Sequence, residues 1–454
     1  MNRRNFIKKS AITSAGAVIL PRYVLGGKGY QAPSDTLNIA AIGAGGRGAS
    51  VMSQLTSQNI VAICDVDFNR VEGAFYNNQG ELNESRRPLK EAYDKAVRYH
   101  DFRDMLEKQN DIDAVVIATP DHTHAPAASM AMKLGMHVYV EKPLTWSVHE
   151  ARVLRDLAEE TGLVTQMGNQ GHSGDDGRRL VELVRAGVIG EVYESHIWTD
   201  RPRWPQGMSY PGTPEAIPDY VNWDMFLGPA PYRPYHSAFH PWNWRGWVDW
   251  GTGALGDMGA HLIDHTKWAL NLGAPKAIEA SGSPFGENQA SYPLSTLIHY
   301  EFELESGNTH KMSWYDGGLL PGRPEAVPSS VEINRGGGGM LIGEKGVVMY
   351  DTYGNNPRYF PEGIEQEYSN VEQTLDRIDV SHGMNWVNAC KGLNEPSCPF
   401  DYAGPLTELM LLGVIALRTE YGKKFYWNDD TGQFSNSTDA DQLLHREYRR
   451  GWEL

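Results

Sequence analysis

Two short stretches hold side chains that together could remove a proton from a hydroxyl group. Glu141-Lys142-Pro143 follows an apolar run, and Gly256–His265 places Asp257 and His261 four residues apart, on one face of a helix. A carboxylate beside an imidazole can orient the ring and stabilise its protonated form, which makes a competent general base. A lysine ammonium nearby would favour a developing alkoxide. Each stretch also fits an ordinary structural role, as a surface lysine before a turn and as a hydrogen-bonded pair on a helix.

The same helix is also compatible with metal binding, because Asp257, His261 and His265 recur at every fourth residue. A transition-metal ion could take two or three of these side chains as ligands. No zinc signature such as H-E-x-x-H accompanies them. We therefore expect proton transfer at this helix and assign no metal ligand.

A glycine motif near the start of the chain predicts the fold that would position these groups. Leu37–Gly48 (LNIAAIGAGGRG) runs from an apolar, strand-prone segment into the spacing G-x-G-x-x-G. The first glycine would make the tight turn, the second would let a pyrophosphate approach the backbone, and the third would let a helix pack closely on the strand. The expected phosphate-binding residues are Gly43, Gly45, Gly46, Arg47 and Gly48.

An acidic residue follows the next apolar run, where a dinucleotide-binding fold has its ribose-binding carboxylate. Ile60–Cys64 leads into Asp65, seventeen residues after Gly48. A carboxylate here would bind the ribose 2′-hydroxyl of NAD and repel the 2′-phosphate of NADP. An ordinary strand-end residue is the alternative for Asp65, and Asp67 is its rival. The pattern predicts NAD as the cofactor and makes NADP less favourable.

Apolar strands alternate with helices through the first third of the chain. Strands are expected at 113–120, 137–141 and 163–167, and helices at 101–108, 124–134 and 148–160, the last with the capping box Ser147-x-x-Glu150. This alternation predicts a doubly wound parallel Rossmann sheet, whose ligands lie beyond the carboxyl ends of the strands. The strand ends add six expected cofactor-binding residues, Thr119, Pro120, His122, His124, Glu141 and Lys142. The two histidines could equally be ordinary surface-loop residues.

The second half of the chain has a different pattern. A helix is expected at 176–186 and another at 254–270, and a loop-rich segment lies between them. Alternating residues then predict antiparallel strands near 295–303, 310–315, 331–334 and 346–350, with a glycine turn at 336–339. The apolar stretch 406–419 predicts a helix that packs against the core.

Aromatic and basic residues in these loops are the candidates for substrate binding. Trp242, Trp244, Trp247 and Trp250 lie close together in the sequence, and they could either pack beneath the loops or present ring faces to a sugar. The expected substrate contacts are Arg201, Trp204, Trp244, Trp314 and Tyr315.

Composition limits the partners. The formal net charge is −16, which argues against nucleic-acid and anionic-membrane partners. The three cysteines form no disulfide framework, although a bridge between Cys390 and Cys398 is left open.

The first 27 residues have the pattern of a twin-arginine export signal, with Arg3-Arg4 and then a mildly apolar stretch too short to span a bilayer. We therefore expect the export machinery as a partner and a periplasmic or otherwise exported protein, which acquires its nucleotide before leaving the cell.

Taken together and in this order, the glycine fingerprint, Asp65, Thr119-Pro120, Glu141-Lys142-Pro143 and Asp257-x-x-x-His261 resemble the glucose–fructose oxidoreductase/inositol dehydrogenase (Gfo/Idh/MocA) family. The resemblance implies an N-terminal Rossmann domain and a C-terminal α/β domain with an open, mostly antiparallel sheet, often a dimerisation surface. It further implies that Lys142 contacts substrate and cofactor, and that Asp257 and His261 are the catalytic pair, with His261 as proton acceptor. The expected divisions are 1–27 (signal), 34–167 (NAD-binding), 168–400 (substrate and oligomerisation) and 401–454 (C-terminal helix and tail).

The activity that this resemblance implies is NAD-dependent oxidation or reduction of a sugar, glycoside or cyclitol hydroxyl. Outside the cytoplasm there is no free nicotinamide pool, so we expect a tightly bound cofactor in a dimer or tetramer. A redox-neutral, NAD-dependent glycoside hydrolase is the alternative; the family branch with that activity differs from Glu141-Lys142-Pro143, which favours the dehydrogenase. A non-catalytic sugar-binding protein on the same scaffold is the third possibility.

Overall fold

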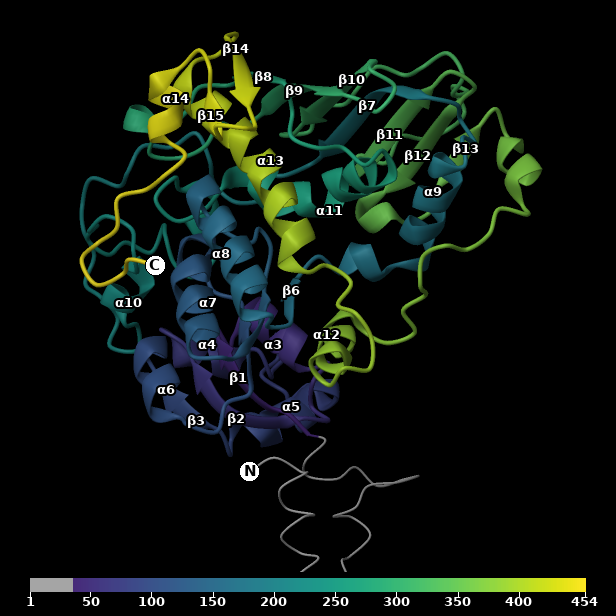
Figure 1. Ribbon diagram of the computed structural model, residues 1–454. Helices are drawn as coiled ribbons and strands as arrows, with labels where there is room; N and C mark the ends of the chain where they lie inside the picture. Colours follow the sequence, from purple (N-terminus) through teal and green to yellow (C-terminus); the bar gives the residue numbers. More distant parts are fainter. Residues whose placement is uncertain (1–35) are drawn as a thin grey trace, which may run out of the picture. The chain divides into compact units, whose positions relative to one another are not determined.

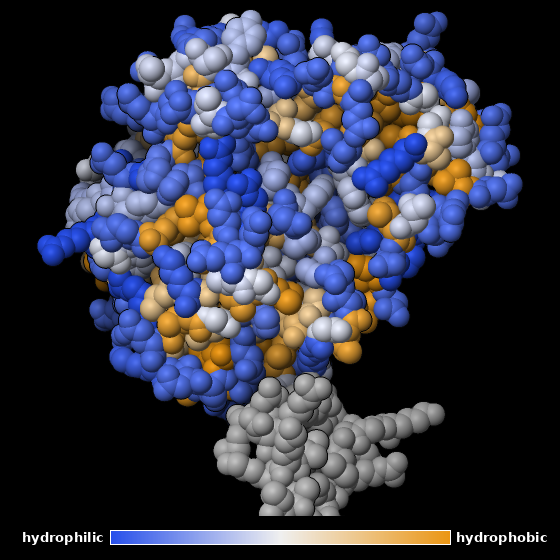
Figure 2. Space-filling model, viewed as in Figure 1, coloured by the Kyte–Doolittle hydropathy of each residue, from blue (hydrophilic) through white to orange (hydrophobic). Residues whose placement is uncertain are grey.

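The computed structural model describes residues 36–454, so the expected export signal at 1–27 lies outside the described residues. Asn38–Leu454 forms one compact unit and contains two sheets with helices packed on both (Figure 1). The face drawn in Figure 2 is mostly hydrophilic, with scattered apolar areas.

The first sheet is six-stranded and parallel, in the order β3-β2-β1-β4-β5-β6, which is the Rossmann order. Its strands are β1 (Asn38–Ile42), β2 (Asn59–Cys64), β3 (Val97–Tyr99), β4 (Ala114–Ile117), β5 (His137–Val140) and β6 (Thr165–Met167). The helices of this part are α3 (Gly46–Met52), α4 (Phe68–Gly73), α5 (Arg87–Tyr93), α6 (Phe102–Lys108), α7 (His124–Lys133) and α8 (Val148–Thr161). The inner strands are continuous apolar runs because helices cover both faces of the sheet. The predicted doubly wound sheet is confirmed.

The start of α8 shows how local sequence sets an element boundary. The Ser147 hydroxyl accepts the backbone N–H of Glu150, and the Glu150 carboxylate accepts the N–H of Ser147. The helix ends at Gly162, whose φ of 62° lies in the left-handed region that glycine tolerates best. The capping box predicted from the sequence is therefore present.

The second sheet has nine strands in the order β13-β12-β11-β7-β10-β9-β8-β14-β15, and only the pair β7–β10 is parallel. Its strands are β7 (Val192–Thr199), β8 (Ala277–Gly282), β9 (Thr296–Glu303), β10 (Thr309–Tyr315), β11 (Gly337–Gly343), β12 (Val347–Asp351), β13 (Arg358–Phe360), β14 (Lys424–Asn428) and β15 (Gln433–Phe434). The remaining helices are α9 (Asp175–Arg185), α10 (Trp223–Leu227), α11 (Gly253–Ala269), α12 (His382–Cys390), α13 (Phe400–Thr419) and α14 (Thr438–Gln442). The expected C-terminal, mostly antiparallel sheet is confirmed.

The predictions of two elements in this part of the chain are wrong. The glycines expected to form a turn at 336–339 instead begin the buried strand β11, which pairs with β7 and β12. A Cβ on Gly339 would lie 2.1 Å from the Tyr350 ring, so glycine is needed to admit that ring rather than to turn the chain. The expected strand at 331–334 is irregular and packs on the sheet through Val331 and Ile333.

Helix α13 connects the two parts of the protein. It packs against α8 of the first part and against α11, and α11 and α13 each contact strands of the second sheet (Figure 1). Gly259 of α11 allows the close approach, because a Cβ there would lie 2.4 Å from the Met410 sulfur of α13. α13 is long and apolar enough to cross a membrane, but 78% of its most apolar window is buried in the protein, as in a core helix.

Candidate functional site

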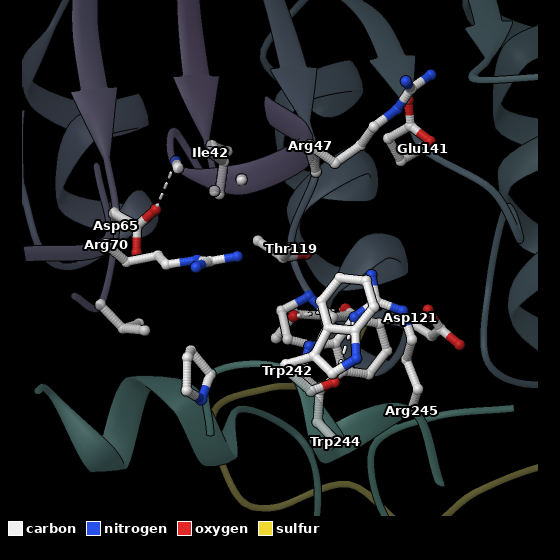
Figure 3. A pocket seen from close by; sticks show the side chains of 18 of the residues that line it. Ile42, Arg47, Asp65, Arg70, Thr119, Asp121, Glu141, Trp242, Trp244 and Arg245 are labelled. Atoms are coloured by element: carbon white, nitrogen blue, oxygen red, sulfur yellow. Dashed lines mark hydrogen bonds and ion pairs between the residues drawn. The ribbon is translucent and has the colours of Figure 1, made fainter. Parts of the chain in front are cut away.

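A cavity of about 620 Å³ lies at the carboxyl ends of the Rossmann strands. Loops after β1, β2, β4 and β5 form one wall, and α11 with the segment 201–245 forms the other. In Figure 3, Asp65 and Arg70 lie at one end of the cavity and Trp242, Trp244 and Arg245 at the other, with Thr119 between them.

The glycine fingerprint has the geometry that its spacing predicts. Gly43 turns the chain with a φ of 80°, and a Cβ on it would lie 2.6 Å from the Ala118 carbonyl. A Cβ on Gly48 would lie 1.9 Å from the Gly43 oxygen, so Gly48 serves close packing and does not line the cavity. Gly45, Gly46 and Arg47 do line it, where α3 begins. A helix start built this way is suited to a pyrophosphate.

Asp65 occupies the end of β2, as expected. Its carboxylate accepts the backbone N–H groups of Gly45 (3.1 Å) and Asp67 (3.0 Å). Burial nevertheless raises the pKa of Asp65 to about 6, because desolvation outweighs these hydrogen bonds. Arg70, which the sequence analysis did not single out, lies beside Gly46 and lines the same end of the cavity. Asp67 instead caps α4, and its carboxylate lies 3.6 Å from His240.

Two buried oxygen atoms in the middle of the cavity wall have no hydrogen-bond partner among the described residues. Glu141 pairs with Arg47 through one oxygen (2.8 Å), while Oε2 has no partner; Thr119 Oγ1 is the second such atom. Buried polar atoms are normally paired, so these positions fit hydrogen bonds to a bound ligand. Together with the glycine turn and Asp65, they fit a dinucleotide.

Lys142 and Asp257 meet across the cavity. The Lys142 ammonium donates to the Asp257 carboxylate (2.9 Å) and to its backbone oxygen (2.5 Å). Arg245 Nε lies 3.4 Å from the same carboxylate oxygen. Burial raises the pKa of Asp257, but the two cations lower it more, to about 2. Asp257 is therefore ionised at neutral pH and fixes the position of Lys142.

His261 has a partner that the sequence analysis missed. Its Nδ1–H donates to Asn169 Oδ1 (3.1 Å), at the end of β6, which leaves Nε2 free of a proton. Burial and the nearby Lys142 charge lower the pKa of His261 well below its ordinary value, so the ring is neutral at pH 7 and can accept a proton. The expectation that Asp257 orients His261 is not what the structure shows, because Asp257 is hydrogen-bonded to Lys142. No sequence pattern connects Asn169 with His261; only the fold brings them together.

Tyr353 is a second cavity residue that the sequence analysis missed. Its ring stands edge-on to His261, with centroids 4.7 Å apart. Its φ of 70° is rare for a residue with a side chain. Such backbone strain persists where surrounding contacts hold it, often at functional sites.

The four tryptophans of the cluster differ in where their rings lie. Trp247 and Trp250 are fully buried in an aromatic core beneath the loops. Trp242 and Trp244 line the cavity; Trp242 is 47% exposed, whereas Trp244 also belongs to the aromatic core. The Arg245 guanidinium lies against both rings, 4.1 and 4.2 Å from their centroids. The expected substrate residues Arg201 and Trp204 line this end of the cavity too.

Besides Gly48, four expected site residues do not line the cavity. His122 Nε2 and both ring nitrogens of His124 hydrogen-bond to backbone carbonyls, so these histidines hold the loop after β4 in place. Trp314 is buried in the second sheet, where it donates to Asp316, and Tyr315 bonds His196 on the opposite face. The remaining expected residues, including Pro120, line the cavity.

Two alternatives from the sequence analysis can also be placed. His265 packs against Gly177 and Gly354. Across residues 36–454, no three His, Cys, Asp or Glu side chains are grouped as metal ligands would be. Cys390 and Cys398 are both free thiols, so the bridge left open above is absent.

Comparisons with known proteins agree with this geometry. The family model "Oxidoreductase family, NAD-binding Rossmann fold" matches residues 37–169, and the model of the C-terminal α/β domain of the same GFO_IDH_MocA family matches residues 203–292. A "Glycosyl hydrolase family 109 protein" from Shewanella pealeana is 31% identical over an alignment of 211 residues, and the alignment covers 42% of this chain and 44% of that protein. The chain thus aligns with less than half the length of the curated relatives it matches.

Solved structures show the same fold at low sequence identity. The WlbA dehydrogenase from Bordetella pertussis, in complex with NADH and UDP-GlcNAcA, is 17% identical with a TM-score of 0.57, covering 87% of this chain and 99% of its own. An inositol dehydrogenase homolog from Azotobacter vinelandii, complexed with NADH and myo-inositol, is 17% identical with a TM-score of 0.54, covering 86% and 98%.

Proposed function

We propose, for a chain that carries the NAD-binding and C-terminal α/β domains of the Gfo/Idh/MocA oxidoreductase family, that it is an NAD-dependent oxidoreductase acting on a hydroxyl group of a sugar, glycoside or cyclitol. The observation that supports this best is the convergence of a neutral His261 and the Lys142 ammonium at the carboxyl ends of the Rossmann strands. Asp65 at the ribose end favours NAD over NADP.

In this proposal the chain's own residues handle the proton, and bound NAD supplies the hydride acceptor. His261 Nε2 accepts the hydroxyl proton, because its Nδ1–H is committed to Asn169. The Lys142 ammonium, held by Asp257, stabilises the negative charge that develops on the substrate oxygen. Glu141 Oε2 and Thr119 Oγ1 would hold the cofactor in place through hydrogen bonds.

The proposal extends to location and assembly. The twin-arginine pattern of the first 27 residues supports export of the folded protein with NAD already bound. An exported enzyme without a nicotinamide pool needs a retained cofactor, so tight binding belongs to the same proposal. We also propose a homo-oligomer, for which the family resemblance is the support.

A second candidate function has a specific observation in its favour, namely that the curated relatives are named as glycosyl hydrolase family 109 proteins. In a redox-neutral hydrolase, transient oxidation of a ring hydroxyl acidifies the neighbouring C–H and permits elimination of the aglycone. Water then adds, and the keto group is reduced again. The same His261 and Lys142 would serve the oxidation and the final reduction.

One experiment separates the two functions. The mature protein is purified without added cofactor and mixed with a panel of glycosides in D₂O, with nicotinamide absorbance and sugar products recorded from the same samples. Stoichiometric NADH with an intact keto sugar supports the dehydrogenase. Cleaved glycoside, deuterium beside the transiently oxidised carbon and no lasting NADH support the hydrolase. Bound NAD with neither signal would count against both.

A further inference from the structure

The end of the cavity opposite Asp65 holds more cations than carboxylates. Asp257 is shared by the Lys142 ammonium (2.9 Å) and the Arg245 guanidinium (3.4 Å). A single carboxylate balances only one of these two charges. Lys142 and Arg245 therefore leave one positive charge in excess, on side chains that are mostly buried.

The adjoining loop repeats this arrangement. Asp200 is shared by Arg201 (2.6 Å) and Arg203 (2.7 Å), and both arginines line the cavity. A second positive charge is thus in excess. Asp121 is the other carboxylate at this end; it accepts the Thr252 hydroxyl, and burial raises its pKa. Even when Asp121 is ionised, the cations outnumber the carboxylates.

This excess contrasts with the rest of the molecule, whose formal net charge is −16. An acidic surface repels anions on average, so a local concentration of arginine needs a reason of its own. Concave sites focus the field of the charges that line them, which makes the cavity attractive to an anion in spite of the net charge.

The Arg245 guanidinium is held in a fixed orientation, in addition to carrying a positive charge. The rings of Trp242 and Trp244 lie against its guanidinium, which restricts the side chain and removes water from it. Its Nε points to Asp257 and its Nη1 to the Trp242 backbone oxygen, while Nη2 has no hydrogen-bond partner among the described residues. A restrained, planar guanidinium suits a carboxylate or a sulfate.

The cofactor's own charge does not account for these arginines. A pyrophosphate at the glycine turn would lie beside Arg47, at the start of α3. Arg201, Arg203 and Arg245 instead come from the second domain and line the cavity. Arg245 lies beside Trp242 and Trp244 (Figure 3). These arginines lie at the end of the cavity opposite Asp65, where the proposed function places the substrate.

We propose that the substrate is a sugar bearing an anionic group, a uronate carboxylate or a sulfate ester, which Arg201, Arg203 and Arg245 bind. This inference rests on the proposed function, because it assigns the substrate class of the same site. Trp242, exposed at the cavity mouth, offers its ring to an apolar sugar face beside the bound anion.

The test uses matched sugars and the full chain with NAD bound. Methyl glucuronide, glucose 6-sulfate and neutral methyl glucoside are titrated by calorimetry at low and high salt, and NAD affinity is measured separately. The variants are Arg203→Gln and Arg201→Gln. Arg155→Gln is the control, because Arg155 has the same charge and pairs with Asp156 on α8, away from the cavity.

We expect at least one anionic sugar to bind about tenfold or more tighter than its neutral counterpart. The advantage should shrink at high salt and in both cavity variants, but not in Arg155→Gln, with NAD affinity unchanged. A preference for the carboxylate or for the sulfate would identify the group. Equal binding of neutral and anionic sugars would overturn the inference. Cavity variants that lower the affinity for NAD, and not the affinity for the anionic sugar, would also overturn it.

Turnover is recorded in the same samples, so that the two proposals fail separately. Selective binding of an anionic sugar with neither NADH nor a cleaved product would retain this inference and refute the proposed function. Turnover of neutral and anionic sugars with equal kcat/KM would do the reverse.

Discussion

In the proposed function His261 is the general base, because Nδ1 is hydrogen-bonded to Asn169 and Nε2 is free to accept a proton. Asn169 Oδ1 accepts a hydrogen bond from the Nδ1–H of His261, and burial with the Lys142 charge keeps the ring neutral. Asp257 acts on Lys142 instead of the imidazole. In the proposed reaction, the pair His261–Asn169 would handle the proton, and the pair Lys142–Asp257 would stabilise the developing negative charge.

Replacing this base gives the most direct prediction. His261→Ala should reduce the rate of nicotinamide reduction by a factor of about 10²–10⁴, the usual contribution of a general base. NAD binding should be preserved, because His261 is not among the groups that fit the dinucleotide. Stopped-flow absorbance and calorimetry measure the two quantities. His299→Ala, on the exposed face of β9, is the control; near-wild-type activity of His261→Ala would refute the assigned role.

Asp65 gives a prediction about pH. Its pKa of about 6 in the NAD-free protein means that the carboxylate is protonated below that value. The ionised form is the better hydrogen-bond acceptor for the ribose hydroxyl, so NAD affinity should fall as pH drops through about 6, approaching tenfold per pH unit. Titration of NAD between pH 5 and pH 8, expressed as Kd, measures this.

The stability of the folded protein should depend on pH in the opposite direction to NAD affinity. A raised carboxyl pKa favours the protonated folded form, so Asp65 should lower the stability of the NAD-free protein as pH rises from about 4 to about 6. Asp65→Asn should lose both dependences. A pH dependence that survives in Asp65→Asn would refute its assignment to Asp65.

At the scale of elements, the sequence predicts the first sheet better than the second. The strands of a parallel sheet are continuous apolar runs, and the glycine turn and the Ser147 capping box mark their positions by local rules that hold before any packing occurs. The site residues at those strand ends, Asp65, Glu141 and Lys142, could therefore be predicted. Asn169 could not, because its partner His261 is 92 residues away.

The glycines of β11 show why the second sheet is harder. In isolation a run of glycines indicates a turn, because glycine is flexible. Here the missing side chains make room for the Tyr350 and Trp198 rings of neighbouring strands. The reason for these glycines lies in residues far away in the chain, so no local pattern reveals it. Trp314 and Tyr315 were misplaced for the same reason.

Tyr350 links this strand to α11, the helix that carries Asp257 and His261, which leads to a prediction. Its hydroxyl donates to the Leu262 backbone oxygen (2.9 Å) and lies 2.9 Å from the Thr266 hydroxyl, both on α11. Gly339→Ala forces the ring to move, so it should destabilise the protein by about 1–3 kcal/mol and also lower kcat. Thermal unfolding and turnover measure these. Gly322→Ala, where a Cβ meets nothing within 4 Å, should change neither; an unchanged melting temperature in Gly339→Ala would contradict the packing argument.

At the scale of the whole molecule, the C-terminal segment connects the two walls of the cavity. Arg446 lies 4.3 Å from the Trp146 ring in the first domain, and Arg449 pairs with Asp224 at the second wall (2.8 Å). Trp452 then packs on Phe102 and lines the cavity at the end marked by Asp65. The last residues of the described chain therefore contribute to the cofactor site itself.

Removing the Trp452 side chain should weaken NAD binding without slowing the reaction at saturating NAD. Trp452→Ala is expected to raise the Kd for NAD by about tenfold, since a buried ring contact is worth roughly 1–2 kcal/mol at the edge of a site. The rate with saturating NAD should stay close to that of the wild type, because His261 and Lys142 lie at the other end of the cavity. Trp427→Ala is the matched control, because Trp427 is equally buried but packs on Phe434, away from the cavity. It should lower the melting temperature without changing NAD affinity. Equal effects of the two variants on NAD binding would mean that Trp452 acts only through stability.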